Sequence, residues 1–198
     1  MSDLNTDPWI QANSPLPADK LHAIGVIAFR WGRCELGLFL LLSAVAKLSR
    51  RDVWGMTHDL GDVSICDKIH TFALRRGYHP DGLALIKNAL ALYDRCRQNR
   101  NTVVHAWTFS RSLDPPLARR SRKAIEPEPT PFPSSLADLR RVADDIGGLE
   151  TRLWLLDCLL EEGMLNGPIT FPGIQPLPEI LSTPPQPYSK EHSRPPRS

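Results

Sequence analysis

The sequence predicts an all-α protein, a helical bundle of about four to five helices with a disordered Pro-rich C-terminal tail. Apolar residues recur every three or four positions in several long stretches, and no segment alternates apolar and polar residues for more than a few positions. The 19 prolines of the 198-residue chain cluster outside these stretches. Because proline blocks helix continuation, residues 18–111 and 135–163 are free to be helical.

The first long helix is expected over residues 18–49. Its stripe of helical spacing consists of Leu21, Ile24, Ala28, Trp31, Glu35, Leu38, Leu42 and Val45. Every member is apolar except Glu35, which this pattern places at the helix seam. A lone carboxylate is costly to bury, so Glu35 is expected to have a partner.

Three further helices are expected. Residues 64–76 form a shorter helix with Ser64 as N-cap and Gly77 as its end, and the ambiguous stretch before it has room for a helical turn. Residues 80–110 open with a proline and carry the stripe Leu83, Ile86, Leu90, Tyr93, Arg97, Arg100, Val104 and Trp107. Residues 135–162 carry the unbroken stripe Leu139, Val142, Ile146, Leu149, Leu153, Leu156 and Leu160.

These elements divide the chain into three parts. Residues 1–17 are expected to be a flexible N-terminal segment, residues 18–163 a helical domain, and residues 164–198 a Pro-rich tail. Within the domain, residues 111–134 form a loop rich in proline and cations. Its cluster of cations is either a solvated loop or a weak RNA-binding contact through phosphate groups. That cluster consists of Arg119, Arg120, Arg122 and Lys123.

Composition narrows the class of protein. The net charge of +2 demands no particular partner. The four cysteines form no C-x-x-C pair, which argues against a zinc site and against a dense disulfide framework, and no cofactor is expected. The N-terminus has no basic-then-apolar signal pattern, and the longest apolar run, residues 36–46, is too short to cross a bilayer. A cytoplasmic protein without a membrane partner is expected.

The stretch "DRCRQNRNTVVHAWTF", residues 94–109, interrupts the apolar pattern with polar groups. Arg97 and Arg100 are expected to meet Glu35 inside the bundle, either as a structural ion pair or as support for a site. On a continuing helix, Asn101 and His105 lie one above the other with Arg100 beside them. A guanidinium binds phosphate oxygens and an imidazole moves a proton near neutral pH, so the group suits a phosphodiester.

The string "RNTVVHAW" resembles the R-x4–6-H signature of HEPN domains, in the variant where a polar residue follows the arginine. HEPN domains are helical bundles, and many are metal-independent endoribonucleases that act as toxins paired with an antitoxin protein or in phage defence. The resemblance implies catalytic roles for Arg100, Asn101 and His105, with Glu35 and Arg97 in support. It also implies RNA as substrate and a homodimer that builds one site from two copies.

A second interpretation is a non-catalytic HEPN-like helical module for dimerisation or for binding a nucleotide or partner. It is favoured if Arg100 and His105 point into a sealed core, whereas the nuclease requires both to be presented together to solvent. A di-iron bundle is excluded because it needs E-x-x-H pairs, which the six histidines do not supply.

Overall fold

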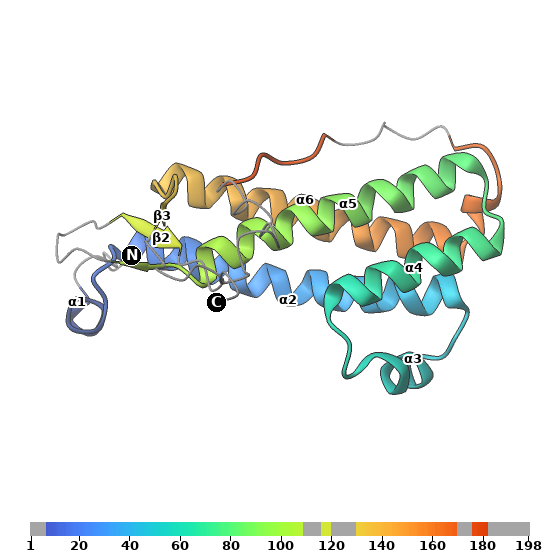
Figure 1. Cartoon of the computed structure of the whole chain (residues 1–198), viewed down its shortest axis with the longest axis horizontal. Coiled ribbons are helices and arrows are strands. Elements are labelled where there is room, and N and C mark those ends of the chain that lie inside the picture. The colour runs from blue at the N-terminus through green and yellow to red at the C-terminus, as the bar shows by residue number, and fades with distance from the viewer. Residues whose placement is uncertain (1–6, 109–115, 120–129, 170–175, 182–198) are drawn as a thin grey trace, which may run out of the picture.

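The computed structural model describes residues 7–108, 116–119, 130–169 and 176–181. Three long helices, α2 (Ala18–Ala46), α5 (Pro80–Val104) and α6 (Leu136–Glu161), run along the length of the molecule (Figure 1). The shorter α4 (Asp62–Arg76) packs beside the C-terminal half of α2. This architecture confirms the predicted helical bundle.

The pair of α2 and α6 forms the main helix–helix contact of the bundle. Gly37 allows a close approach at its centre, because a Cβ built there would lie 3.0 Å from the Cβ of Leu153. At the rim, Arg30 donates to the carbonyl of Ala143 at 2.7 Å. These contacts fix α6 against α2.

The buried face of α2 lies slightly to one side of the predicted stripe. Its core residues include Ala23, Ile27, Trp31, Cys34, Leu38, Leu41, Leu42 and Val45. Residues 28 and 35 are exposed. Placing Glu35 in the interior was therefore wrong. The leucine-rich stretch allows two apolar stripes of helical spacing, and only the one centred on Cys34 faces the other helices.

Helix ends follow local capping chemistry. Gly77 ends α4 with φ of 68°, as predicted, but Gly61 rather than Ser64 is the N-cap. Ser135 caps α6 through a reciprocal capping box with Asp138, and this hydroxyl lowers the pKa of the Asp138 carboxyl. Helix α5 ends at Val104, six residues before the predicted end. This early end changes the setting of His105.

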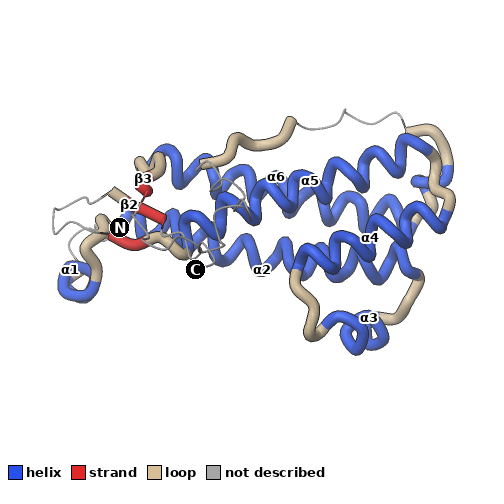
Figure 2. The backbone as a smooth tube through the Cα atoms, viewed as in Figure 1, coloured by secondary structure: helices blue, strands red, loops and turns tan. Residues whose placement is uncertain are grey.

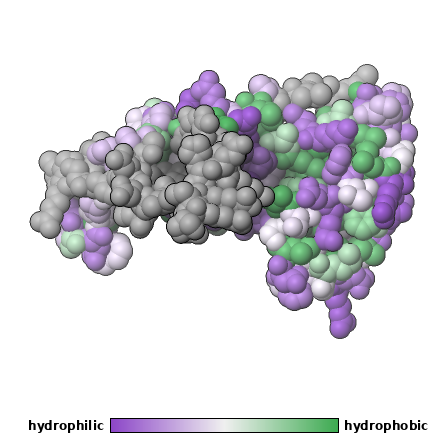
Figure 3. Space-filling model, viewed as in Figure 1, coloured by the Kyte–Doolittle hydropathy of each residue, from purple (hydrophilic) through white to green (hydrophobic). Residues whose placement is uncertain are grey.

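Two short helices flank the bundle. Helix α1 (Pro8–Asn13) lies in the segment expected to be flexible, where Asp7 accepts a hydrogen bond from the Trp9 amide and a proline occupies the first turn. Helix α3 (Arg50–Thr57) fills the ambiguous stretch and lies beside the bundle (Figure 2), with Val53 buried in the core. At the α3–α4 end of the molecule, apolar and polar residues are interspersed on the surface (Figure 3).

A small antiparallel sheet closes the other end. Strands β1 (Trp107–Thr108), β2 (Leu117–Arg119) and β3 (Thr130–Pro131) pair in the order β1-β2-β3. The sequence predicted no strand there because two or three residues are too few to show alternation. Most of the predicted loop 111–134 lies outside the described residues.

Part of the predicted C-terminal tail packs on the bundle. After the short 3-10 helix η2 (Met164–Asn166), residues 176–181 lie extended along α5 and α6 (Figure 1). Leu181 is 5% exposed and joins the hydrophobic core. The rest of the tail, residues 170–175 and 182–198, is outside the described part of the chain. Among the described helices, none has the length and apolarity needed to cross a bilayer.

Candidate functional site

Arg100 lies on the last turns of α5 and rests on an aromatic surface. Its Cζ is 5.7 Å from the centre of the Trp31 ring, and its Nη1 donates to Oδ1 of Asn101 at 2.9 Å. The side chain is half-buried, and its Nε is shielded from solvent without a hydrogen-bond partner among the described residues. A guanidinium on an aromatic face is partly desolvated, which strengthens its attraction for an anion.

Trp31 is the platform under this guanidinium. It is 1% exposed, packs on Tyr93 with ring centres 4.8 Å apart, and donates from Nε1 to Oε1 of Glu35 at 2.6 Å. Burial raises the pKa of the Tyr93 phenol, and the Asp62 and Glu35 carboxylates raise it further, so Tyr93 stays neutral. Glu35 therefore orients the indole from the surface.

The predicted meeting of Glu35 with the two arginines does not occur in the described structure. Arg97 pairs with Asp94 at 2.6 Å one turn earlier on the same helix, and Gln98 also donates to Asp94. Arg100 has no ion pair among the described residues. Because Glu35 lies outside the seam, it contributes through Trp31, while Arg97 belongs to a surface pair.

His105 directly follows the last residue of α5 and lies one helical turn after Asn101. It is the C-cap of α5, with φ of −99° and ψ of 14°, and its backbone N–H donates to the carbonyl of Asn101 at 3.2 Å. The residue is exposed, and no described hydrogen bond joins its ring to Arg100 or Asn101. Arg100 and Asn101 are thus brought together by contact, whereas His105 is placed near them by the chain alone.

The sheet brings the start of the basic cluster to the same end of the molecule. Strand β1 begins two residues after His105 and pairs with β2, with Trp107 opposite Ala118. Only the backbone of Arg119 is described, at the end of β2. Arg120, Arg122 and Lys123 lie outside the described residues. No group of three or more possible metal ligands occurs within the described ranges.

Sequence reasoning missed Asn99, the most buried polar residue of α5. It is 1% exposed, its Nδ2 donates to the carbonyl of Glu179 at 2.8 Å, and its Oδ1 accepts the amide of Leu181 at 2.9 Å. A signal was available, because position 99 continues the buried series Leu85, Ala89, Leu92, Cys96 and Val103. An amide on such a stripe predicts a buried polar partner.

Comparison with known proteins adds no family assignment. Neither a family model, nor a curated protein, nor a solved structure matches this chain.

Proposed function

We propose that the protein is a metal-independent endoribonuclease of HEPN type. Arg100 binds the scissile phosphate, Asn101 orients it, and His105 transfers a proton. The observation that carries this proposal is the pairing of Arg100 with Asn101 on the Trp31 platform, next to an exposed histidine at the helix end. A fixed guanidinium and a nearby exposed imidazole are what phosphodiester cleavage without a metal requires.

The reaction uses the 2′-hydroxyl of the RNA as nucleophile. A base takes the hydroxyl proton as its oxygen bonds to phosphorus, and an acid gives a proton to the 5′-oxygen as the phosphorus–oxygen bond breaks. The products carry a 2′,3′-cyclic phosphate and a 5′-hydroxyl. One chain supplies one histidine in this setting, so two copies are needed to supply both acid and base.

The outer face of α2 supports such a dimer. Gly25, Phe29, Gly32 and Leu36 follow one another at spacings of four, three and four residues, on the side opposite the core. Phe29 is 70% and Leu36 49% exposed, and a Cβ built at either glycine meets nothing within 4 Å. A second α2 running antiparallel, centred between residues 30 and 31, places Phe29 opposite Gly32 and Leu36 opposite Gly25. This pattern of large against small residues is self-complementary.

The same symmetry sets the two candidate sites at one level on one flank of the dimer, each on the core-facing side of its own α2. The two-fold axis of this dimer is perpendicular to the plane that contains the two α2 helices. Rotation about it leaves the same flank of each copy on the same side of the dimer. Arg100 lies over Trp31, so both guanidinia fall at the level of the axis. RNA bound along this flank then meets two arginines and two exposed histidines, and the basic cluster in the sequence after β2 adds cations for its phosphates. A toxin or phage-defence role in the cytoplasm, with an antitoxin protein as a further partner, fits this activity.

The second candidate is a non-catalytic module for dimerisation or for binding a partner or nucleotide. The buried Nε of Arg100, which has no hydrogen-bond partner in the described part of the chain, favours it, because that side of the guanidinium serves packing. In this case Arg100 binds a phosphate without cleavage.

Purified protein incubated with total RNA tests the proposal. His105→Ala and Arg100→Ala are each expected to lower the cleavage rate by about 10²-fold or more, as loss of an acid–base or charge-stabilising group does. His58→Ala is a matched control, since His58 is also an exposed helix C-cap, and Arg75→Ala controls for loss of an exposed cation. EDTA is expected to have no effect. Cleavage by His105→Ala at the wild-type rate would overturn the assignment.

A further inference from the structure

Residues 176–181, here called the strap, are recognised by the bundle through their backbone. The Asn99 carboxamide donates to the carbonyl of Glu179 and accepts the amide of Leu181, the two groups that flank Ile180. This is the pattern with which one residue of a parallel strand bonds its neighbour. The buried Asn99 side chain therefore makes the two hydrogen bonds that a residue of a neighbouring strand would make.

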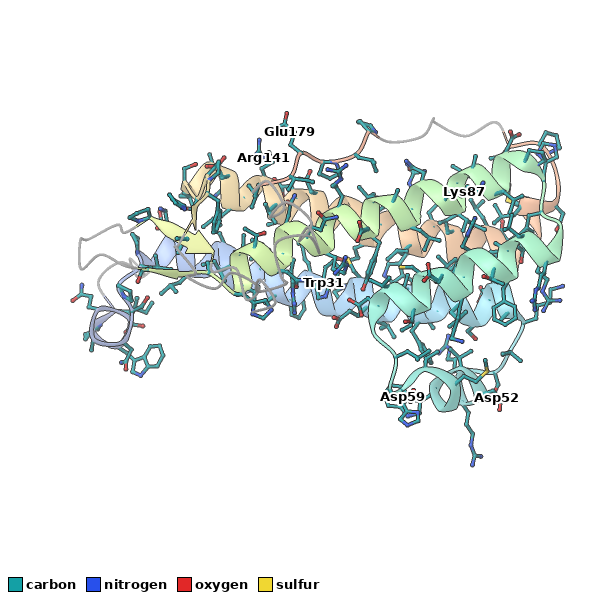
Figure 4. The ribbon with its side chains drawn as sticks, viewed as in Figure 1. Trp31, Asp52, Asp59, Lys87, Arg141 and Glu179 are labelled. Atoms are coloured by element: carbon teal, nitrogen blue, oxygen red, sulfur yellow. The ribbon has the colours of Figure 1, made fainter. Side chains whose placement is uncertain are left out.

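Two side chains add sequence preference to this backbone contact. Leu181 is 5% exposed and packs into the core, so an apolar side chain is required at that position. Glu179 lies beside Arg141 of α6, with Oε2 3.6 Å from Nη1, although both side chains are largely exposed (Figure 4). The leucine therefore contributes most of the binding free energy, and the acidic residue contributes selectivity.

The strap is also suited to docking by its own sequence, "PLPEIL". Pro178 holds Leu177 in an extended conformation, and Pro176 and Pro178 have no amide hydrogen to satisfy. An extended segment that is already stiff loses less conformational entropy on binding. The side chain of Leu177, at 43% exposed, points away from the core.

We propose that Asn99, Arg141 and the core position filled by Leu181 form a peptide-docking site for an extended segment with an acidic residue two places before a leucine. The strap is its occupant within the same chain, and it can be exchanged for the same sequence added in trans. Docking ties the last turns of α5 to α6 and to the tail. This inference stands independently of the proposed ribonuclease activity.

The test uses the full chain with the strap disabled. Leu181→Asp removes the anchoring side chain and leaves the docking site intact, and Leu177→Asp is the matched control in the same segment. A labelled PLPEIL peptide is expected to bind Leu181→Asp in fluorescence anisotropy. It is expected to bind wild type and Leu177→Asp at least about tenfold more weakly, because a tethered competitor has an effective concentration on the order of millimolar.

Asn99 is tested on the Leu181→Asp background. Asn99→Ala is expected to abolish peptide binding, and Arg141→Ala to weaken it only a few-fold, with circular dichroism confirming that the helices persist. A peptide with aspartate in place of its leucine is expected not to bind. Hydrogen exchange should show the Leu181 amide protected in wild type and the amide at this position unprotected in Leu181→Asp.

Three results would overturn the proposal. One is a peptide that binds wild type and Leu181→Asp equally. Another is a Leu181→Asp protein whose strap amides stay protected from hydrogen exchange and which binds no peptide. The third is protection that rises with protein concentration, which would assign the strap to a second copy.

Discussion

At the residue scale, Trp31 links the core to the candidate site. One face of its ring packs against Tyr93, its N–H is satisfied by Glu35, and Arg100 lies over it. Sequence reasoning proposed Arg100 and Asn101 as site residues, and it expected Glu35 to contact the arginines rather than Trp31. It could not find Trp31 as the platform, because Trp31 and Arg100 lie on two different helices, 69 positions apart. No sequence pattern links the two partners of such a cation–π pair.

The cysteines give a prediction at this scale. Burial raises the pKa of the Cys34, Cys66 and Cys96 thiols to about 12, and nearby carboxylates add to the rise for all three. At pH 8 only about one molecule in 10⁴ then carries a given thiolate, so alkylation of the native protein should modify the exposed Cys158 first. Mass spectrometry of peptides after brief iodoacetamide treatment measures this order. Equal labelling of Cys34 and Cys158 would contradict it.

The same pKa shifts set a dependence of stability on pH. A thiol whose folded pKa lies above its unfolded value of 9.0 keeps its proton longer in the folded state. Its contribution to stability is therefore complete below pH 9 and is lost as the pH rises toward 12. Urea unfolding across this range should show a falling free energy of unfolding.

At the element scale, the long helices were predictable and their exact ends were not. The apolar stripe of α6 was predicted because every turn of that helix supplies a leucine, valine or isoleucine. The end of α5 was placed too late because "VVHAW" continues the apolar spacing, whereas the pairing of β1 with β2 draws the chain out of the helix. Such pairing depends on residues nine and eleven positions away, which helical periodicity does not report.

The close packing of α2 against α6 leads to a prediction about the stability of the protein. Gly37→Ala forces its Cβ against Leu153 and is expected to destabilise the protein by about 1–2 kcal/mol. Gly148→Ala, at an exposed position of α6 where a Cβ meets nothing within 4 Å, is expected to stabilise it by about 0.5–1 kcal/mol through helix propensity. Urea unfolding followed by circular dichroism compares the two. A Gly37→Ala protein more stable than wild type would refute the close packing.

At the scale of the whole molecule, the sequence predicted the class of fold, but it did not predict which residues of each helix are exposed. The apolar stripe of α2 was interpreted as one seam, although the helix has two faces with different uses. Gly25, Phe29, Gly32 and Leu36 lie outside the core, and Asn99 lies inside it. Burial of these residues is decided by the neighbouring helices, so a single helix's pattern cannot assign it.

The proposed dimer is tested at this scale. Phe29→Glu places a charge where the second copy's Gly32 would pack, and is expected to leave the chain monomeric at concentrations where wild type dimerises. Leu74→Glu, an equally drastic change at an exposed position of α4, is expected to remain dimeric. Sedimentation equilibrium measures both, and loss of RNA cleavage should accompany loss of the dimer. A wild-type chain that is monomeric at tens of micromolar would exclude this interface.

The enclosure of Trp31 makes the site optically readable. Trp9, Trp54 and Trp154 are open to water, so their fluorescence lies at longer wavelengths, while the enclosed indole emits at the blue edge of the spectrum. A guanidinium directly over that indole perturbs its excited state. An anion that draws Arg100 from the ring therefore changes the blue-edge emission. Binding can then be followed without a label and separately from any cleavage in a Trp107→Phe protein, which removes the fifth tryptophan.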